Sequence, residues 1–581
     1  YPASGRLRDA DAPHIGGAGA SLELTVEMPE HWHAVAQGRR TERQDNSATR
    51  IRRVTWREPR PLASLDFVAG PYLLSRSKNQ DFEAEVLLRS PAPALAKRYL
   101  AATHRYVTQY SRLLGAYPHQ RFTLVENDRP TGWGMATFTL LGNRVIRLPF
   151  IIHTSYPHEI VHSWWGNGVY AGGDGNWTEG LTTYLADHAL RESKGEGVTF
   201  RRDALARFRA HEATGAAFPL HQFRARHSRA AQAVGYDKSM MLFHMVRRRL
   251  GDQRFVKALQ TVAASRQFTA VGFDELLAAL GGESTRKAFA PWLNAVGVPT
   301  VTLVAAAQRS SNRVQVSVRQ SGSDGTLELD VPIAVLDNKG SYTLSRHRMT
   351  TKTATFEVPV NGHAKGVVLD PHIDLLRRIN ADEVAPRIGD AFARPTMRFA
   401  YRASGTKPSP AAWQVLAGHW MRDKMRDNRP SPPAVRPSTD SSATKSTTPD
   451  TTAVVWLGTP PPWAAAALDA LKTAKVTRAP HQALAMAWRT ASGDTELWLS
   501  TVDAALIERM ARALPHYGKR SYVLFDPGLP RAAAAGQWPV APASNRIALD
   551  NSAPSTWPPI PEPAPLLTDR TPGLAPIIQS N

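Results

Sequence analysis

The segment His158-Glu159-Ile160-Val161-His162 contains the residue types and the spacing of a catalytic metal site. Two histidines four residues apart on a helix are rotated by only about 40° and lie one turn apart, so both imidazoles can bind one ion. Glu159 then lies next to that ion, where a carboxylate can accept a proton from an activated water. The segment therefore predicts a zinc site that hydrolyses a bond, with Glu159 as the general base.

The third ligand distinguishes between the possible classes of zinc site. Position 168 is Gly168, which excludes the helical metzincin pattern, because that pattern needs a histidine there. A carboxylate from a following helix gives the other arrangement, in which zinc has two histidines, one glutamate and a water. Glu179 lies 17 residues after His162 at the start of an apolar-periodic stretch, and the glycine-rich residues between them can fold back. We expect His158, His162 and Glu179 to bind one zinc ion per chain.

Asp187 lies eight residues after Glu179 on the same expected helix. A carboxylate near a zinc ligand can orient its imidazole by accepting a hydrogen bond from it. A solvated position on the helix surface is the alternative interpretation, and the sequence leaves both open.

The stretches HEIVHSWWGN and NWTEGLTTYL resemble the zinc aminopeptidase family, the gluzincin metallopeptidases such as aminopeptidase N and leukotriene hydrolase. The spacing between the two stretches is two residues shorter than is usual in that family, and Thr178 replaces an asparagine. The resemblance covers roughly residues 1–390 and leaves the rest of the chain unexplained. It implies a zinc cofactor, peptide substrates and the role of general base for Glu159.

A second segment of the same family has the pattern Y-x-K-G-x-x-x-L-x-x-L, and residues 235–255 resemble it. Tyr236 and Lys238 are kept, whereas Ser239 stands in place of the glycine. The resemblance implies that Tyr236 donates a hydrogen bond to the oxyanion of the tetrahedral intermediate. Losing one such donor typically costs about 10²–10³ in rate.

The strand expected before the zinc helix departs from the family. Family members bind the free amino group of the substrate partly through the glutamate of a G-x-M-E-N motif. The matching stretch here is GWGMATFTLLG (132–142), in which Ala136 and Thr137 occupy the E and N positions. Gly134, Met135 and Ala136 are therefore candidate substrate-binding residues that lack the family's carboxylate.

Three functions remain open on these residues. The first is a zinc metallopeptidase of the aminopeptidase type. The second is an endo- or dipeptidyl-type zinc hydrolase, which the alanine at position 136 favours. The third is a basic protein that binds zinc without catalysis, although a structural zinc site needs no glutamate at position 159.

The elements that must position these residues belong to a multidomain α+β chain of 581 residues. Short β-rich and helical stretches alternate along it, and the stretches group into seven regions. They are a partial N-terminal β domain (1–80), a thermolysin-like, mainly helical zinc domain (81–297), a β-sandwich (298–390), a connecting helical segment (391–427), a Ser/Thr/Pro-rich linker (428–452), a small α/β domain (453–550) and a Pro-rich tail (551–581). Because members of the resembled family carry a longer N-terminal β domain, we expect part of that domain to precede Tyr1.

Composition limits the remaining classes of function. The chain has 71 Lys and Arg against 50 Asp and Glu, a formal charge of +21, and it has no cysteine. The lack of cysteine excludes disulfides and thiolate metal sites. The basic run at 247–249 resembles a nucleic-acid stripe, but no recognition motif accompanies it, so we expect a solvated helix face and no nucleic-acid partner.

Membrane insertion and compartment complete the expectations. No apolar run approaches the length of about 20 residues that a membrane-spanning helix needs, so we expect no transmembrane segment. A basic, cysteine-free hydrolase with a Ser/Thr/Pro-rich linker fits a bacterial cell envelope or periplasm, and the cytoplasm is the alternative.

Overall fold

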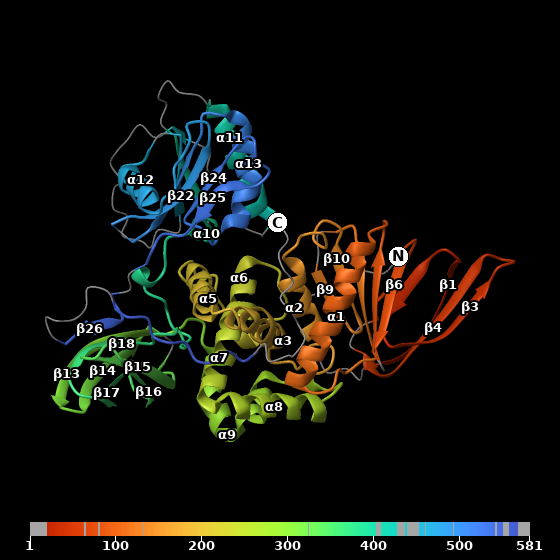
Figure 1. Cartoon of the computed structure of the whole chain (residues 1–581), viewed down its shortest axis with the longest axis horizontal. Helices are drawn as coiled ribbons and strands as arrows, with labels where there is room; N and C mark the ends of the chain where they lie inside the picture. The colour runs from red at the N-terminus through yellow and green to blue at the C-terminus, as the bar shows by residue number, and fades with distance from the viewer. Residues whose placement is uncertain are drawn as a thin grey trace.

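Helices form the centre of the molecule, and β-sheets lie towards its periphery (Figure 1). The computed structural model describes residues 20–62, 65–79, 82–129, 132–322, 325–394, 396–401, 408, 410–426, 436–437, 452–458, 460–491, 493–540, 543–549 and 557–567. The chain is multidomain and mixes helices with sheets, as the sequence predicts. Within the described residues, no helix has both the length and the apolar character needed to cross a membrane.

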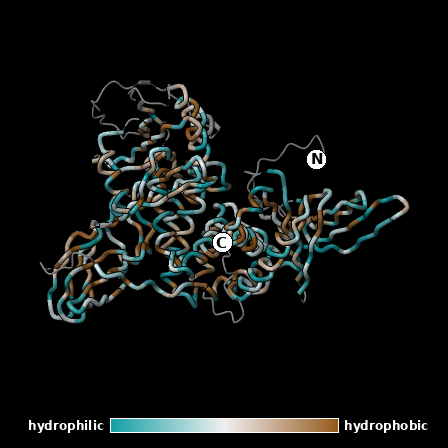
Figure 2. The backbone as a smooth tube through the Cα atoms, turned by 45° about the horizontal axis from the view of Figure 1, so that its top comes forward, coloured by the Kyte–Doolittle hydropathy of each residue, from teal (hydrophilic) through white to brown (hydrophobic). Residues whose placement is uncertain are grey.

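The N-terminal strands form a three-stranded antiparallel sheet that projects from one end of the molecule (Figures 1 and 2). Its order is β1 (Ala20–Pro29), β4 (Ile51–Leu62) and β3 (Arg39–Asn46). A separate pair joins β2 (His33–Ala36) to β5 (Phe67–Gly70). Val54 and Trp56 on β4 are buried, and they pack with Met28 of β1 and Ala36 of β2 in a small core that holds the sheet to β2.

A five-stranded sheet connects this region to the helices. Its order is β6 (Leu73–Asn79), β7 (Phe82–Leu88), β8 (Arg121–Asn127), β10 (Phe138–Gly142) and β9 (Gly132–Met135). The sheet therefore extends across residue 80, where the sequence suggests a domain boundary. Helix α1 (Pro93–Leu114) packs against β6 and β7 and ends at Gly115, whose φ of 97° suits glycine. Among the strands that the structure describes, β9 pairs with β10 alone and forms the edge of the sheet.

The helices that follow carry the residues singled out by the sequence. Two of the helical stretches change from α to π geometry and back to α. The helical elements are α2 (Ser155–Val161), α3 (Thr178–Thr182), the π-helix η2 (Thr183–His188), α4 (Ala189–Glu192), α5 (Gly197–Glu212), α6 (Arg229–Gln232), the π-helix η4 (Ala233–Lys238), α7 (Ser239–Leu250), α8 (Asp252–Ser265) and α9 (Phe273–Asn294), with short 3-10 turns at Ile151–His153 and Leu220–Gln222. Their buried faces form one continuous core with α1 and the neighbouring sandwich.

Two sheets form the sandwich, and one of them contains a strand from the far end of the chain. The first sheet is β13 (Thr300–Ser310), β14 (Arg313–Ser321) and β17 (Thr353–Pro359). The second is β16 (Tyr342–Met349), β15 (Leu329–Asp337), β18 (Ala364–Leu369) and β26 (Arg546–Ala548). Figure 1 shows β26 beside β18. At the end of β18, the carbonyl oxygen of Leu369 accepts a hydrogen bond from the side-chain amide of Asn545, which lies 176 positions later in the sequence.

Residues 557–567 form no helix or strand. The Tyr342 hydroxyl donates to the carbonyl oxygen of Pro558 at 3.1 Å. The backbone N–H of Leu566 donates to Glu192 Oε2 at 2.9 Å, and Leu567 is buried in the central core. The described part of the Pro-rich tail therefore runs from the sandwich back to the helical domain.

The last unit is a seven-stranded mixed sheet covered by helices on both faces. Its strands, in spatial order, are β20 (Arg436–Pro437), β19 (Thr396–Tyr401), β21 (Thr452–Leu457), β23 (Thr495–Ser500), β22 (Ala483–Arg489), β24 (Tyr522–Phe525) and β25 (Ala532–Gly536), and its helices are α10 (Ile388–Ala393), α11 (Pro410–Arg426), α12 (Ala464–Thr473) and α13 (Ala504–Ala513). The stretch 391–427, expected to be helical, thus contains strand β19. Most of the expected linker 428–452 lies outside the described residues.

The basic run at 247–249 is not a solvated face, so this prediction is wrong. The Arg247 side chain is completely buried and donates to Glu192 Oε2 and Asp252 Oδ1, both at 2.8 Å. Arg249 donates to Asp330 Oδ2 at 2.6 Å, across the contact between α7 and the sandwich. Buried charges need partners, and two of these partners, Glu192 and Asp330, lie far away in the sequence, where a local pattern does not show them.

Candidate metal centre

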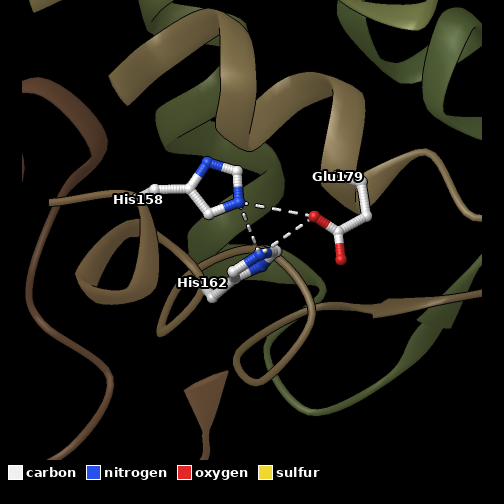
Figure 3. Close-up of side chains that lie close together, drawn as sticks. All are labelled: His158, His162 and Glu179. Atoms are coloured by element: carbon white, nitrogen blue, oxygen red, sulfur yellow. Dashed lines mark hydrogen bonds and ion pairs between the residues drawn. The ribbon is translucent and has the colours of Figure 1, made fainter. Parts of the chain in front are cut away.

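The side chains of His158, His162 and Glu179 converge at one point between α2 and α3 (Figure 3). The two Nε2 atoms of the histidines are 3.1 Å apart. Glu179 Oε2 lies 3.4 Å from His158 Nε2 and 3.2 Å from His162 Nε2. Among the described residues, this is the group of three side chains placed to hold a metal ion.

The hydrogen bonds of the two imidazoles fix which nitrogen faces that point. His158 Nδ1–H donates to Asp187 Oδ2 at 2.6 Å, and His162 Nδ1–H donates to the carbonyl oxygen of Trp165 at 2.9 Å. Both Nε2 atoms therefore present lone pairs to each other and to the Glu179 carboxylate. A cation between these three atoms would stabilise them, and in its absence the raised pKa of His158 favours a proton on an imidazole in that place.

The spacing of the three atoms fits zinc. Zinc binds histidine nitrogen and carboxylate oxygen at about 2.0–2.1 Å in tetrahedral geometry, which separates neighbouring ligand atoms by about 3.3 Å. The three separations of 3.1, 3.2 and 3.4 Å agree with this value. The donor set, two imidazoles and one carboxylate, is the set found in hydrolytic zinc sites that keep a fourth position for water.

The chain folds back between the ligands in a glycine-rich loop. Helix α2 ends at Val161, with His162 still in helical conformation as its last cap, so the two histidines keep the spacing of one helical turn. Gly166 and Gly175 adopt φ angles of 111° and 114°, which side chains other than glycine rarely tolerate. Between them, the short strand Tyr170–Ala171 pairs with Ala270–Val271 and anchors the loop. The loop returns the chain to α3 next to α2.

Glu159 follows His158 on α2 and lies against strand β9. A Cβ atom added to Gly134 would lie 2.7 Å from Glu159 Oε2, and one added to Gly132 would lie 3.3 Å from Oε1. The carboxylate therefore occupies space that side chains at these two positions would fill. Gly134 also lies 3.5 Å from the Cβ of His162 by the same measure, so β9 borders the metal centre.

Tyr236 lies on the π-helix η4, next to His158. Its ring is parallel to that of His158, with an interplanar angle of 9° and a centroid separation of 6.2 Å. Lys238, two residues later on the same helix, holds it in the interior, because its buried ammonium donates to the carbonyl oxygens of Ala295 and Val296, which follow α9. The hydroxyl group of Tyr236 is thus held near the metal ligands.

The π-helix η2 explains how Asp187 reaches a zinc ligand. Two turns of an α-helix take about seven residues, so a residue eight positions after Glu179 would be rotated away from it. A π turn adds a residue, which brings position 187 back to the face of Glu179. The sequence left the orienting and solvated interpretations of Asp187 open, and its carboxylate contacts His158.

Burial and neighbouring charge shift the pKa values at this centre. Burial opposes ionisation of Glu179, but the two imidazoles lower its pKa below the usual range. Burial alone would lower the pKa of His158, but Asp187 and Glu179 raise it well above the ordinary value. Burial raises the pKa of Glu159 and, with Glu179 nearby, that of Tyr236.

The structure brings together His158, Glu159, His162, Glu179, Asp187 and Tyr236, and it places Gly134 and Met135 on the adjacent β9. Ala136 and Thr137 form the turn between β9 and β10, with Ala136 buried. Sequence reasoning missed the Trp165 carbonyl as the partner of His162. A backbone acceptor leaves no trace in residue type, so no sequence signal would have identified it.

This fold and centre define a class of protein, the hydrolases that use a His₂Glu metal centre with an adjacent carboxylate. Residues 152–292 match the family model described as Peptidase family M1 domain, a segment that contains all three metal-binding candidates and Tyr236. Residues 152–292 are therefore a domain of the M1 peptidase type, whose family members are zinc-dependent metallopeptidases, as the resemblance implied for this part of the chain. A comparison with curated proteins gives no match.

Proposed function

We propose that this chain hydrolyses peptide bonds as a zinc metallopeptidase of the aminopeptidase type. The observation that carries the proposal is the convergence of His158 Nε2, His162 Nε2 and Glu179 Oε2 within 3.1–3.4 Å, with the Glu159 carboxylate against the same helix. Zinc bound there would supply a Lewis acid that polarises a carbonyl and lowers the pKa of a water to about 7.

Three side chains have distinct parts in the proposed reaction, namely those of Glu159, Tyr236 and Asp187. Glu159 accepts the proton of the attacking water and later delivers it to the leaving amine. Tyr236 donates a hydrogen bond from its hydroxyl to the oxyanion that forms on the scissile carbonyl. Asp187 holds the His158 imidazole in the tautomer that presents Nε2 to the metal.

Strand β9 is the proposed binding surface for the peptide. It is the edge of the five-stranded sheet and borders both Glu159 and His162. An extended peptide can add to such an edge through backbone hydrogen bonds, which would place its scissile carbonyl beside the metal. Gly134 and Met135 on the strand, with Ala136 at its end, are the candidate contacts.

An endo- or dipeptidyl-type specificity is the second candidate, and Ala136 favours it. Ala136 is buried at the end of β9, where the family's glutamate would pair with a substrate ammonium. A neutral side chain at this position provides no charge for a free amino terminus.

The location in a bacterial cell envelope stays a prediction.

Paired peptides distinguish these candidates. Fluorogenic peptides of identical sequence, with a free or an acetylated amino terminus, would be offered to the full chain after metal removal and after zinc is restored. Zinc-dependent cleavage of the free peptide alone supports the aminopeptidase type, and equal cleavage of both supports the second candidate. Absence of zinc-dependent cleavage of either peptide refutes the proposed function.

A further inference from the structure

The loop from Phe223 to Ser228 lies at the rim of the metal centre. The Phe223 ring packs edge-on against the Tyr236 ring, with centroids 6.1 Å apart. Gly235 permits this packing, because a Cβ atom there would lie 2.1 Å from the Phe223 ring. The Ser228 hydroxyl accepts the Ala231 N–H at 3.0 Å, so the end of the loop begins the helix that leads to Tyr236.

The other side of the loop is attached to the residues before Glu179. The Asn176 N–H donates to the carbonyl oxygen of Phe223 at 2.8 Å. The Asn176 side-chain amide donates to the carbonyl oxygen of Arg224 at 2.9 Å. The loop is therefore fixed between the element that carries Glu179 and the element that carries Tyr236.

The basic residues of this loop differ in what they contact. The Arg224 guanidinium donates to the carbonyl oxygens of His221, Phe223 and Gly173 and so holds the backbone. Arg226, two residues on, is exposed and makes no hydrogen bond or ion pair with the described residues. Arg226 lies between Phe223, whose ring packs on Tyr236, and Ser228, which begins the helix that leads to Tyr236, so the fixed loop places it at the rim of the centre.

The carboxylates near this rim already have partners. Asp187 accepts from His158, and Glu179 faces both histidines. Asp237 accepts from Arg207 at 2.6 and 2.9 Å. Apart from Glu159, which lies against β9 as the proposed base, the charged side chain that the described residues leave for a substrate at this rim is thus the Arg226 cation, whereas Ala136 is neutral where the family carries a glutamate.

We propose that Arg226 binds a carboxylate of the substrate, so that the enzyme prefers peptides with a carboxylate next to the scissile bond. The inference rests on the proposed function and names its substrate class. The carboxylate comes from one of two sources, an acidic side chain or the free carboxyl terminus of a short peptide. A guanidinium pairs with a carboxylate through two parallel hydrogen bonds, which adds geometric selectivity to the attraction.

Peptides of equal length separate the two sources. One has neutral side chains and an amidated end, one has an acidic side chain and an amidated end, and one has neutral side chains and a free carboxyl terminus. We expect the full, zinc-loaded chain to cleave one of the two carboxylate peptides with a kcat/KM about 10- to 100-fold above that of the neutral amide, the range of a charge-assisted hydrogen bond. Arg226→Ala should abolish this preference and leave cleavage of the neutral amide within about 2-fold.

Two variants control the assay. Arg226→Lys keeps the charge without the planar fork and should retain part of the preference. Arg254→Ala removes an exposed arginine from α8 and should leave the preference unchanged. A wild-type chain without preference, or an Arg226→Ala variant that slows all three peptides equally, overturns the inference.

Binding separates failure of this inference from failure of the proposed function. The affinities of the same three peptides for the wild type and for Arg226→Ala are measured by calorimetry, without reference to turnover. If no peptide is cleaved but Arg226→Ala weakens binding of one carboxylate peptide by about 10-fold or more, the inference holds and the proposed function fails. If the variant binds all three peptides as the wild type does, the inference fails even where cleavage occurs.

Discussion

Replacing Gly180 with alanine should damage the metal centre through the packing of two helices. Gly180 follows Glu179 in α3, and α3 crosses α7 at Ser239, three residues after Tyr236. A Cβ atom at position 180 would lie 2.0 Å from Ser239 Oγ and 2.3 Å from its Cβ. Carbon atoms in contact lie about 3.5–4.0 Å apart, so the helices must separate by more than about 1 Å.

This separation acts on both sides of the centre at once. Overpacking of a tight core costs about 1–3 kcal/mol of stability. A displacement of about 1 Å between catalytic groups costs about 10²-fold in rate. We therefore expect Gly180→Ala to cleave a fluorogenic peptide about 100-fold more slowly than the wild type, when both are zinc-loaded, and to melt at a lower temperature.

The neighbouring serine supplies the control. Ser239→Gly removes the clashing Cβ and Oγ atoms, and Ser239 Oγ makes no hydrogen bond with the described residues, so little polar pairing is lost. The double variant should recover most of the lost rate, although a contact of 3.1 Å with the Ser239 backbone remains. Wild-type rate in Gly180→Ala, or a double variant no faster than Gly180→Ala alone, would refute this reasoning.

Three further predictions follow from other contacts. Asp187→Asn weakens a 2.6 Å hydrogen bond to His158 and should lower zinc affinity about 10- to 100-fold, measured by competition with a chelator; an unchanged affinity would contradict this role. Leu567→Ala should lower the free energy of unfolding by about 2–4 kcal/mol in denaturant titration, because Leu567 is buried in the central core; a change below about 0.5 kcal/mol would mean that the tail is not docked. Burial, helped by Arg201, lowers the pKa of His244 to about 3. Below about pH 6.5 the histidine of the unfolded chain therefore binds a proton, whereas that of the folded chain stays neutral. The free energy of unfolding should fall by about 2 kcal/mol per such histidine from pH 7 to pH 5, and a stability that does not fall would contradict a buried neutral His244.

The geometry of the metal centre was predictable from the sequence because it depends on local spacing. Four residues make about one helical turn, so His158 and His162 share a face whatever the rest of the chain does. Glycines at 166 and 175 indicate a loop that can fold back. The catalytic roles of these residues and the domain boundaries remain predictions.

Features that depend on distant contacts were not predictable in this way. The 247–249 run looks solvated as a local pattern, but Arg249 reaches Asp330, 81 residues away. Strand β26 lies far beyond the predicted sandwich in the sequence and still pairs with β18. A strand of three residues is too short for its hydrophobic pattern to indicate which strand it pairs with. The π turn that directs Asp187 towards His158 has no characteristic residue types by which the sequence would indicate it.

The Glu159→Gln variant tests the central claim most directly, with zinc content and peptide hydrolysis measured on the same sample. The substituted glutamine keeps the shape of the side chain and leaves His158, His162 and Glu179 in place, but its amide cannot accept the proton. The account predicts one zinc per chain and a rate lower by about 10²–10⁴-fold, the usual contribution of a general base. Wild-type hydrolysis by this variant, or a chain that binds no zinc at this centre, would contradict the account.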